Sequence, residues 1–144
     1  MRARWISWLL CTALLAAWQG MVLAQEVAAP DARAVQRVIR AQLDAFASDD
    51  ADKAFSYASP DIRRLFRAAD NFLAMVRNGY AVVYRPASVV FLKPGRDGDQ
   101  IVQPVQMTDG AGLVWIALYS MQRQDGGAWL TNGCRLGRSE GRVT

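Results

Sequence analysis

The chain contains no histidine and only two cysteines, Cys11 and Cys134, among its 144 residues. The lack of histidine excludes a Ser-His-Asp triad, a Cys-His nucleophile pair and any histidine-ligated metal site. Two cysteines are also too few for a structural zinc site built from thiolates. The residue inventory therefore predicts neither a metal nor another cofactor.

Long apolar runs are also scarce, and the only one lies at the N-terminus. Residues Trp5 to Trp18 are almost all apolar, Arg2 and Arg4 precede them, and Val22-Leu23-Ala24 follow. A basic start, an apolar stretch and small residues at a cleavage site are typical of a secretory signal peptide. The run is shorter than the ~20 residues that a spanning helix needs, which favours cleavage after Ala24 over a retained anchor. We expect a signal peptide over residues 1–24, export to the periplasm, and no stable membrane anchor after cleavage.

Removal of residues 1–24 leaves 120 residues and one cysteine, Cys134, so the mature chain cannot form an internal disulfide. Without Arg2 and Arg4 there are 15 basic and 13 acidic residues, a net charge of +2. These charges are scattered, whereas nucleic-acid binding requires a clustered basic face, so we expect no nucleic-acid partner. A chain of this length is one ordinary domain.

The first half of the mature chain has helical periodicity. After a flexible lead at 25–30, apolar residues recur at intervals of three, four and seven from Val35 to Phe46, which predicts a helix over 32–48 capped by Asp31. A second helix is expected over 51–57. Ser59-Pro60 is a strong start signal for a third. A fourth should begin at Asp70 or Asn71 and end at Gly79 in a left-handed cap.

The second half alternates with a period of two. It predicts four strands, at 87–92, 100–108, 113–123 and 129–136, with a loop at 94–99 and a polar tail at 137–144. Short turns between the strands imply antiparallel pairing. Pro104 predicts an edge strand or a bulge. Because 113–123 is apolar on both faces, we expect the outer face of the sheet to form a homodimer. The fold class is α+β, with residues 31–136 as one domain.

Several stretches resemble an exported bacterial family described as domain of unknown function 4864. They are Ala41–Phe46, Ala54–Arg63, Asn71–Val76, Tyr84–Pro86, Val114–Tyr119 and Asn132–Cys134. The order of elements also resembles the nuclear transport factor 2-like fold, a cone of curved sheet around a long helix. The resemblance implies this fold and export, and it implies no activity.

The predicted strands carry no Asp, Glu or His in their interiors, and the acids of this half fall in turns, where they usually serve turn geometry. This disfavours an acid/base enzyme, so we predict no catalytic residue. Hydrogen-bonding side chains in an apolar wall are typical of a ligand site. The candidates for such a pocket are Tyr57, Tyr84, Gln103, Tyr119, Asn132 and Cys134. The leading interpretation is a domain that binds a small molecule or a partner protein. A pocket enzyme using tyrosine and amide groups, and a thiol-based redox role, remain as alternatives.

Alternation in the last strand places Leu130, Asn132, Cys134 and Leu136 on one face, where the helices should pack. Gly133 predicts a bulge or a close backbone approach. No histidine accompanies Cys134, and Arg135 next to it points the other way. We therefore expect Cys134 to be a buried, inert core residue.

Overall fold

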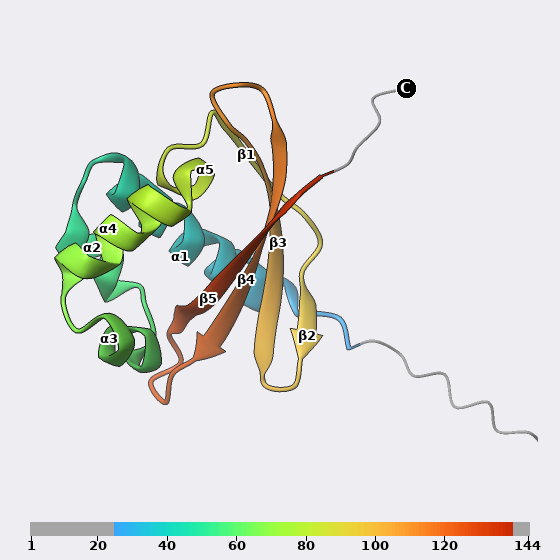
Figure 1. Ribbon diagram of the computed structural model, residues 1–144. Coiled ribbons are helices and arrows are strands. Elements are labelled where there is room, and N and C mark those ends of the chain that lie inside the picture. The colour runs from blue at the N-terminus through green and yellow to red at the C-terminus, as the bar shows by residue number, and fades with distance from the viewer. Residues whose placement is uncertain (1–24, 140–144) are drawn as a thin grey trace, which may run out of the picture.

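The computed structural model describes residues 25–139, so the predicted signal peptide and most of the predicted tail lie outside the described residues. Five helices come first: α1 (Ala29–Ala47), α2 (Ala51–Ser56), α3 (Pro60–Phe66), α4 (Ala69–Gly79) and α5 (Ala81–Tyr84). Five strands follow: β1 (Ser88–Phe91), β2 (Gly95–Asp97), β3 (Gln100–Thr108), β4 (Val114–Arg123) and β5 (Trp129–Arg138). The predicted α+β class, with helices before an antiparallel sheet, is confirmed (Figure 1).

Side-chain caps start two of the helices. Asp50 accepts a hydrogen bond from the backbone N of Lys53 at the start of α2. Ser59 accepts one from the backbone N of Ile62 at the start of α3, as the sequence predicted. The predicted Asp31 cap is wrong, because α1 begins at Ala29 and Asp31 lies in its first turn. Proline fits the first turn of a helix, and Pro30 allows the earlier start.

Gly79 does not end the helical half in a left-handed cap, which corrects the prediction. Gly79 is the last residue of α4, and its φ is not positive. The chain instead turns at Tyr80, where φ is −133°, and continues into the short helix α5. Val82 and Val83 of this helical turn are buried in the core.

All strand pairs are antiparallel, in the order β1-β3-β4-β5, and β2 also pairs with β3. The four predicted strands are therefore present, and β2 is a fifth within the predicted loop at 94–99. Its residues are all exposed, so it carries no apolar alternation that would reveal a strand. The domain also exceeds its predicted bounds at both ends. Glu26 bridges to Gly95 in the expected lead, and β5 continues to Arg138 in the expected tail.

Pro104 lies in an interior strand, so the prediction of an edge strand or a bulge is wrong. Its register with Leu118 on β4 is regular. On the other side, Pro104 O accepts a hydrogen bond from Leu92 N at 3.0 Å, just where β1 has ended and β2 has not begun. The missing N–H of proline therefore faces a gap in the strand pairing, where Gln103 Nε2 donates to Leu92 O instead.

The bulge predicted at Gly133 is confirmed. Ser120 pairs with Gly133 and Met121 with Thr131, so Asn132 is the extra residue, and the φ of Gly133 is +151°. The bulge reverses the alternation along β5. Thr131 faces the core before it, Cys134 faces the core after it opposite Tyr119, and Leu130 faces away opposite Gln122. The prediction that Leu130 shares a face with Cys134 is therefore wrong.

We predict that Gly133→Ala lowers the free energy of unfolding by about 1–3 kcal/mol, because residues other than glycine rarely adopt this backbone conformation. A Cβ at this position meets no atom within 4 Å, so the cost comes from the backbone alone. Gly137→Ala on the same strand is the matched control, since its φ is not positive and its Cβ site is also open. Urea unfolding of the two variants checks this, and equal stabilities would contradict it.

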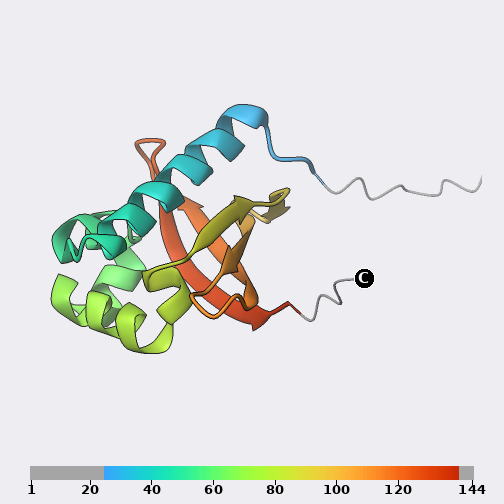
Figure 2. The ribbon, with the colours of Figure 1, turned by 90° about the horizontal axis from the view of Figure 1, so that it is seen from above.

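The core lies between the helices and one face of the sheet. Val35, Ile39 and Phe46 of α1 are buried against the inward side chains of β3 and β4, among them Ile101 and Met121. Figures 1 and 2 show the helices gathered on this side of the curved sheet. Over residues 25–139, no helix covers the opposite face (Figure 1). This arrangement leaves a space between the helical layer and β4–β5.

Candidate functional site

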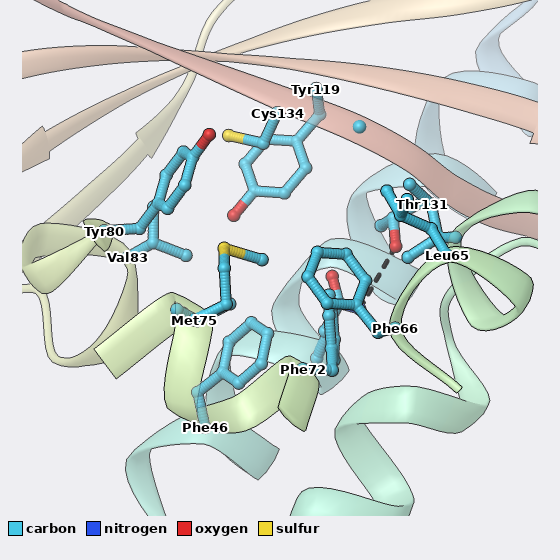
Figure 3. A pocket seen from close by; sticks show the side chains of 14 residues that line it. Phe46, Leu65, Phe66, Phe72, Met75, Tyr80, Val83, Tyr119, Thr131 and Cys134 are labelled. Atoms are coloured by element: carbon cyan, nitrogen blue, oxygen red, sulfur yellow. Dashed lines mark hydrogen bonds between the residues drawn. The ribbon is translucent and has the colours of Figure 1, made fainter. Parts of the chain in front are cut away.

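A cavity of about 210 Å³ lies between α3, α4 and the inward face of β4 and β5. Residues of six elements (α1, α3, α4, α5, β4 and β5) and of the α4–α5 junction line it: Gln42, Phe46, Ile62, Leu65, Phe66, Phe72, Met75, Val76, Tyr80, Val83, Tyr119, Thr131, Gly133 and Cys134. Figure 3 shows the aromatic rings on the helical side facing Tyr119 and Cys134 on the sheet side. Leu65 on α3 is 71% exposed, so the cavity opens to solvent beside that helix.

The cavity wall is apolar and carries no charged side chain. Phe72 on α4 stands at the centre of its helical side. The ring of Phe72 lies 5.6 Å from that of Phe46 on α1, 5.6 Å from that of Phe55 on α2 and 5.5 Å from that of Phe66 on α3. One aromatic side chain thus joins four helices.

The Tyr119 hydroxyl is the single buried side-chain polar atom of the described residues that has no hydrogen-bond partner. Tyr119 is 2% exposed, and its hydroxyl points from β4 toward Met75 on the helical side (Figure 3). The Cys134 sulfur is near, but not in hydrogen-bonding geometry. Burial, followed by the nearby thiol, raises the pKa of Tyr119 well above its usual range. The group therefore stays protonated and is a donor aimed into an apolar space.

The other buried polar groups of the wall are already bonded. Gln42 Nε2 donates to Ala54 O at 3.0 Å and to Thr131 Oγ1 at 3.1 Å. The Thr131 hydroxyl donates in turn to Tyr57 O at 3.1 Å. These bonds tie α1, α2 and β5 together, so they position the wall. Among the buried side chains of the wall, they leave the Tyr119 hydroxyl without a partner in the described residues.

Cys134 lines the cavity and is only partly exposed. The prediction of a core residue needs correction in one respect, since the thiol packs against the core and also borders an open space. Burial raises the pKa of Cys134 to about 12, and the contact with Tyr119 opposes this only in part. A thiol is reactive as the thiolate, so this environment makes Cys134 a poor nucleophile at neutral pH.

We predict that a small maleimide labels native Cys134 slowly at neutral pH, because a thiol with a pKa of about 12 holds very little thiolate there. The rate should rise with pH through the alkaline range, since the thiolate fraction grows tenfold per pH unit below the pKa. Unfolding the protein should accelerate labelling at fixed pH. Labelling of the folded protein as fast as of a free thiol would contradict this and revive the redox alternative.

Two of the six predicted pocket residues, Tyr119 and Cys134, line the cavity, and the other four lie elsewhere. Tyr57 contributes its backbone carbonyl to Thr131. Gln103 is buried on β3 and bonds the carbonyls of Leu92 and Pro104. Asn132 accepts a hydrogen bond from Ser59 Oγ at 2.6 Å. The Tyr57 carbonyl and the side chains of Gln103 and Asn132 therefore connect elements of the fold and do not line the cavity.

Tyr84 belongs to a surface cluster around Asp49. The Asp49 carboxylate accepts hydrogen bonds from the Tyr84 hydroxyl and, at 3.1 Å each, from Arg77 and Arg85. The Tyr84 hydrogen bond, then that of Arg77, lowers the pKa of Asp49. The cluster fastens the end of α1 to α4 and α5, outside the cavity.

Most of the helical wall was not predicted as part of a site. Phe66, Phe72 and Met75 lie at helical spacing, and that spacing does not distinguish a filled core from a cavity wall. No sequence signal shows that Tyr80 borders the same space as Tyr119. Asp109 behaves as the analysis of turn acids expected, since its side chain accepts hydrogen bonds from the backbone N of Ala111 and of Leu113.

Within residues 25–139, no three His, Cys, Asp or Glu side chains lie close enough together to hold a metal ion. No helix within these residues has both the length and the apolarity to span a membrane.

Comparisons with known proteins give a family and nothing more specific. No curated protein and no solved structure matches the chain significantly. The model of one family, described as a domain of unknown function (DUF4864), matches residues 28–144. This match spans most of the chain, including every helix and strand of the described residues and all the residues that line the cavity. The chain is therefore a member of the DUF4864 family.

Proposed function

We propose that the protein binds a small molecule in the cavity between α3, α4 and the sheet. The observation that carries the proposal is the unfilled space of about 210 Å³, bordered by aromatic rings and by one buried hydroxyl that has no partner among the described residues. A cavity of about 150 Å³ lined by aliphatic and aromatic side chains holds benzene, so this one suits a slightly larger molecule. A domain serving only as a scaffold gains nothing from such a void, because each void weakens packing.

The geometry favours binding over the enzymatic alternative. Burial raises the pKa of both the Tyr119 hydroxyl and the Cys134 thiol of the wall, so neither serves as a general base at neutral pH. A tyrosine donor polarises a carbonyl, but a reaction also needs a group that moves a proton or attacks a carbon. The described wall presents no charged side chain for this role.

Calorimetric titration with ethylbenzene tests the proposal. We expect one site per chain with a Kd on the order of 0.1–1 mM, within the range for a ligand of this size. Cys134→Leu adds methyl groups to the cavity and should abolish binding, whereas Cys134→Ala enlarges the cavity and should preserve it. Absence of binding to both the unmodified protein and Cys134→Ala would refute the proposal.

The nuclear transport factor 2-like cone and export belong to the same proposal. A long helix packed across the concave side of a curved antiparallel sheet supports the cone. The basic start, apolar run and small residues of 1–24 support cleavage of a signal peptide and a periplasmic location. Intact-mass measurement of the protein recovered from the periplasm should give residues 25–144, and a mass that retains 1–24 would refute cleavage.

Self-association through the outer face of the sheet is the second part of the proposal. Val90, Leu92 and Leu113 are 48%, 37% and 41% exposed near this face, and Ile116 and Leu118 of β4 are only partly buried on it. Contiguous apolar patches are uncommon on monomers, and a symmetric pair is the commonest way to cover one. Light scattering should give the mass of a dimer at micromolar concentration, and Leu118→Lys should give that of a monomer. A monomer without any substitution would refute it.

A further inference from the structure

The ligand class follows from the one buried polar side-chain atom of the wall that has no partner among the described residues. We infer that the cavity selects a neutral, largely apolar molecule with a carbonyl-type oxygen, which accepts a hydrogen bond from the Tyr119 hydroxyl. This inference rests on the proposed function, since it specifies the ligand of the same cavity. Three features of the cavity support it: the position of the Tyr119 hydroxyl, the absence of charged side chains from the lining residues, and the volume of the space.

The hydroxyl position defines the polar end of the ligand. Buried polar groups are almost always hydrogen-bonded, and an unpartnered one costs the free energy of its lost hydration. Tyr119 is 2% exposed, and its hydroxyl has no partner among the described residues. A water molecule held in a buried site needs two to four polar partners. Gln42 and Thr131 already bond each other, Ala54 O and Tyr57 O, so they offer little to such a water.

The wall also selects against a charged ligand. A carboxylate or phosphate group transferred to an apolar site loses its hydration and needs a cation to compensate. The lining residues include no Lys or Arg, and none of them carries a negative charge for an amine. The nearest equivalent of a charge is the dipole of the Tyr119 O–H bond, which suits the partial negative charge of a carbonyl oxygen.

The size and shape of the space define the rest of the molecule. A volume of about 210 Å³ is about 1.4 times that of the benzene-binding cavity of about 150 Å³. The rings of Phe46, Phe66 and Phe72 form one side of it, opposite Tyr119 (Figure 3). Aromatic rings pack well against another flat ring, so a one-ring ketone, ester or aldehyde fits the site.

Three probes with the same number of non-hydrogen atoms test this inference by calorimetry or ligand-detected NMR. Acetophenone carries the carbonyl, 2-phenylpropene replaces its oxygen by a CH₂ group, and benzoate carries a negative charge. Acetophenone should bind about tenfold tighter than 2-phenylpropene, the effect of one hydrogen bond made by a buried donor. Benzoate should bind too weakly to measure at the concentrations that saturate acetophenone.

Two conservative variants identify the donor. Tyr119→Phe removes only the hydroxyl, and it should reduce the preference for acetophenone over 2-phenylpropene to about onefold without weakening 2-phenylpropene. Tyr84→Phe is the matched control, because its hydroxyl bonds Asp49 outside the cavity, and it should keep the tenfold preference. Circular dichroism of both variants confirms that they are folded.

The outcomes separate this inference from the proposed function. If acetophenone and 2-phenylpropene bind the unmodified protein equally, the cavity binds ligands but the inferred class is wrong. If the preference survives Tyr119→Phe, or if benzoate binds as well as acetophenone, the inference is also overturned. If none of the probes binds, the proposed function itself fails.

Discussion

Phe72→Ala is expected to lower the free energy of unfolding by about 3–5 kcal/mol, the range for truncating a buried phenylalanine. Phe72 is 7% exposed, and its ring contacts those of Phe46, Phe55 and Phe66 from three other helices. Removal of the ring extends the existing cavity. The neighbouring rings cannot fill the added space by small shifts, because it is continuous with space that is already empty. A small domain has about 5–15 kcal/mol of total stability, so the loss is a large fraction of it.

Urea unfolding followed by tryptophan fluorescence measures this effect as a lower midpoint. Leu65→Ala is the control, since Leu65 borders the same cavity but is 71% exposed, and it should change stability by less than about 0.5 kcal/mol. If Phe72→Ala and Leu65→Ala are equally mild, the aromatic cluster does not hold the helical layer together.

Gln103→Leu is expected to lower the free energy of unfolding by about 1–3 kcal/mol, because it leaves a backbone acceptor unpartnered. Gln103 is fully buried, and its Nε2 donates to Leu92 O and Pro104 O at 2.7 Å each. Pro104 O keeps its bond from Leu92 N, whereas Leu92 O lies at the end of β1 beside the gap in the sheet. The Gln103 amide thus supplies Leu92 O with a hydrogen bond that no paired strand provides at this point.

Gln106→Leu provides the control for this prediction. Gln106 lies on the same strand with its side chain on the opposite, half-exposed face, and no hydrogen bond of its side chain is present among the described residues. Its substitution should change stability by less than about 0.5 kcal/mol. Equal effects of the two substitutions would show that Gln103 stabilises the sheet only as an apolar filler.

The sequence predicted the elements well wherever the signal was local. Ser59 and Pro60 start α3 as expected, and the bounds of β3 agree with the alternation from Gln100 to Thr108. Strand β2 was missed because its pairing with β3 leaves all three of its residues exposed, so burial imposes no pattern on them. The environment of Pro104 was predicted wrongly because the gap opposite it lies between β1 and β2. The sequence around the proline carries no information about where those two strands end and begin.

The candidate site was predicted in part, and the reason lies in the bulge. Tyr119 and Cys134 were chosen as hydrogen-bonding residues on strands, and they do face one another across the β4–β5 pairing. The bulge at Gly133 was predicted, but the side-chain faces were predicted from unbroken alternation along the strand. That alternation placed Leu130 on the same face as Cys134, whereas the bulge puts them on opposite faces. The helical wall depends on how α3 and α4 pack against the sheet. Helical spacing predicts which side chains face inward, but it does not predict how far those side chains lie from the sheet.

The most direct test of ligand binding in this cavity is a titration followed through methionine methyl groups. Met75 lines the cavity, whereas Met107 and Met121 are fully buried in the core and do not line it. In protein labelled with ¹³C at the methionine methyl groups, added acetophenone should shift the Met75 signal in a saturable way and leave those of Met107 and Met121 nearly unchanged. A Met75 signal that stays in place up to the solubility limit of acetophenone would contradict the account.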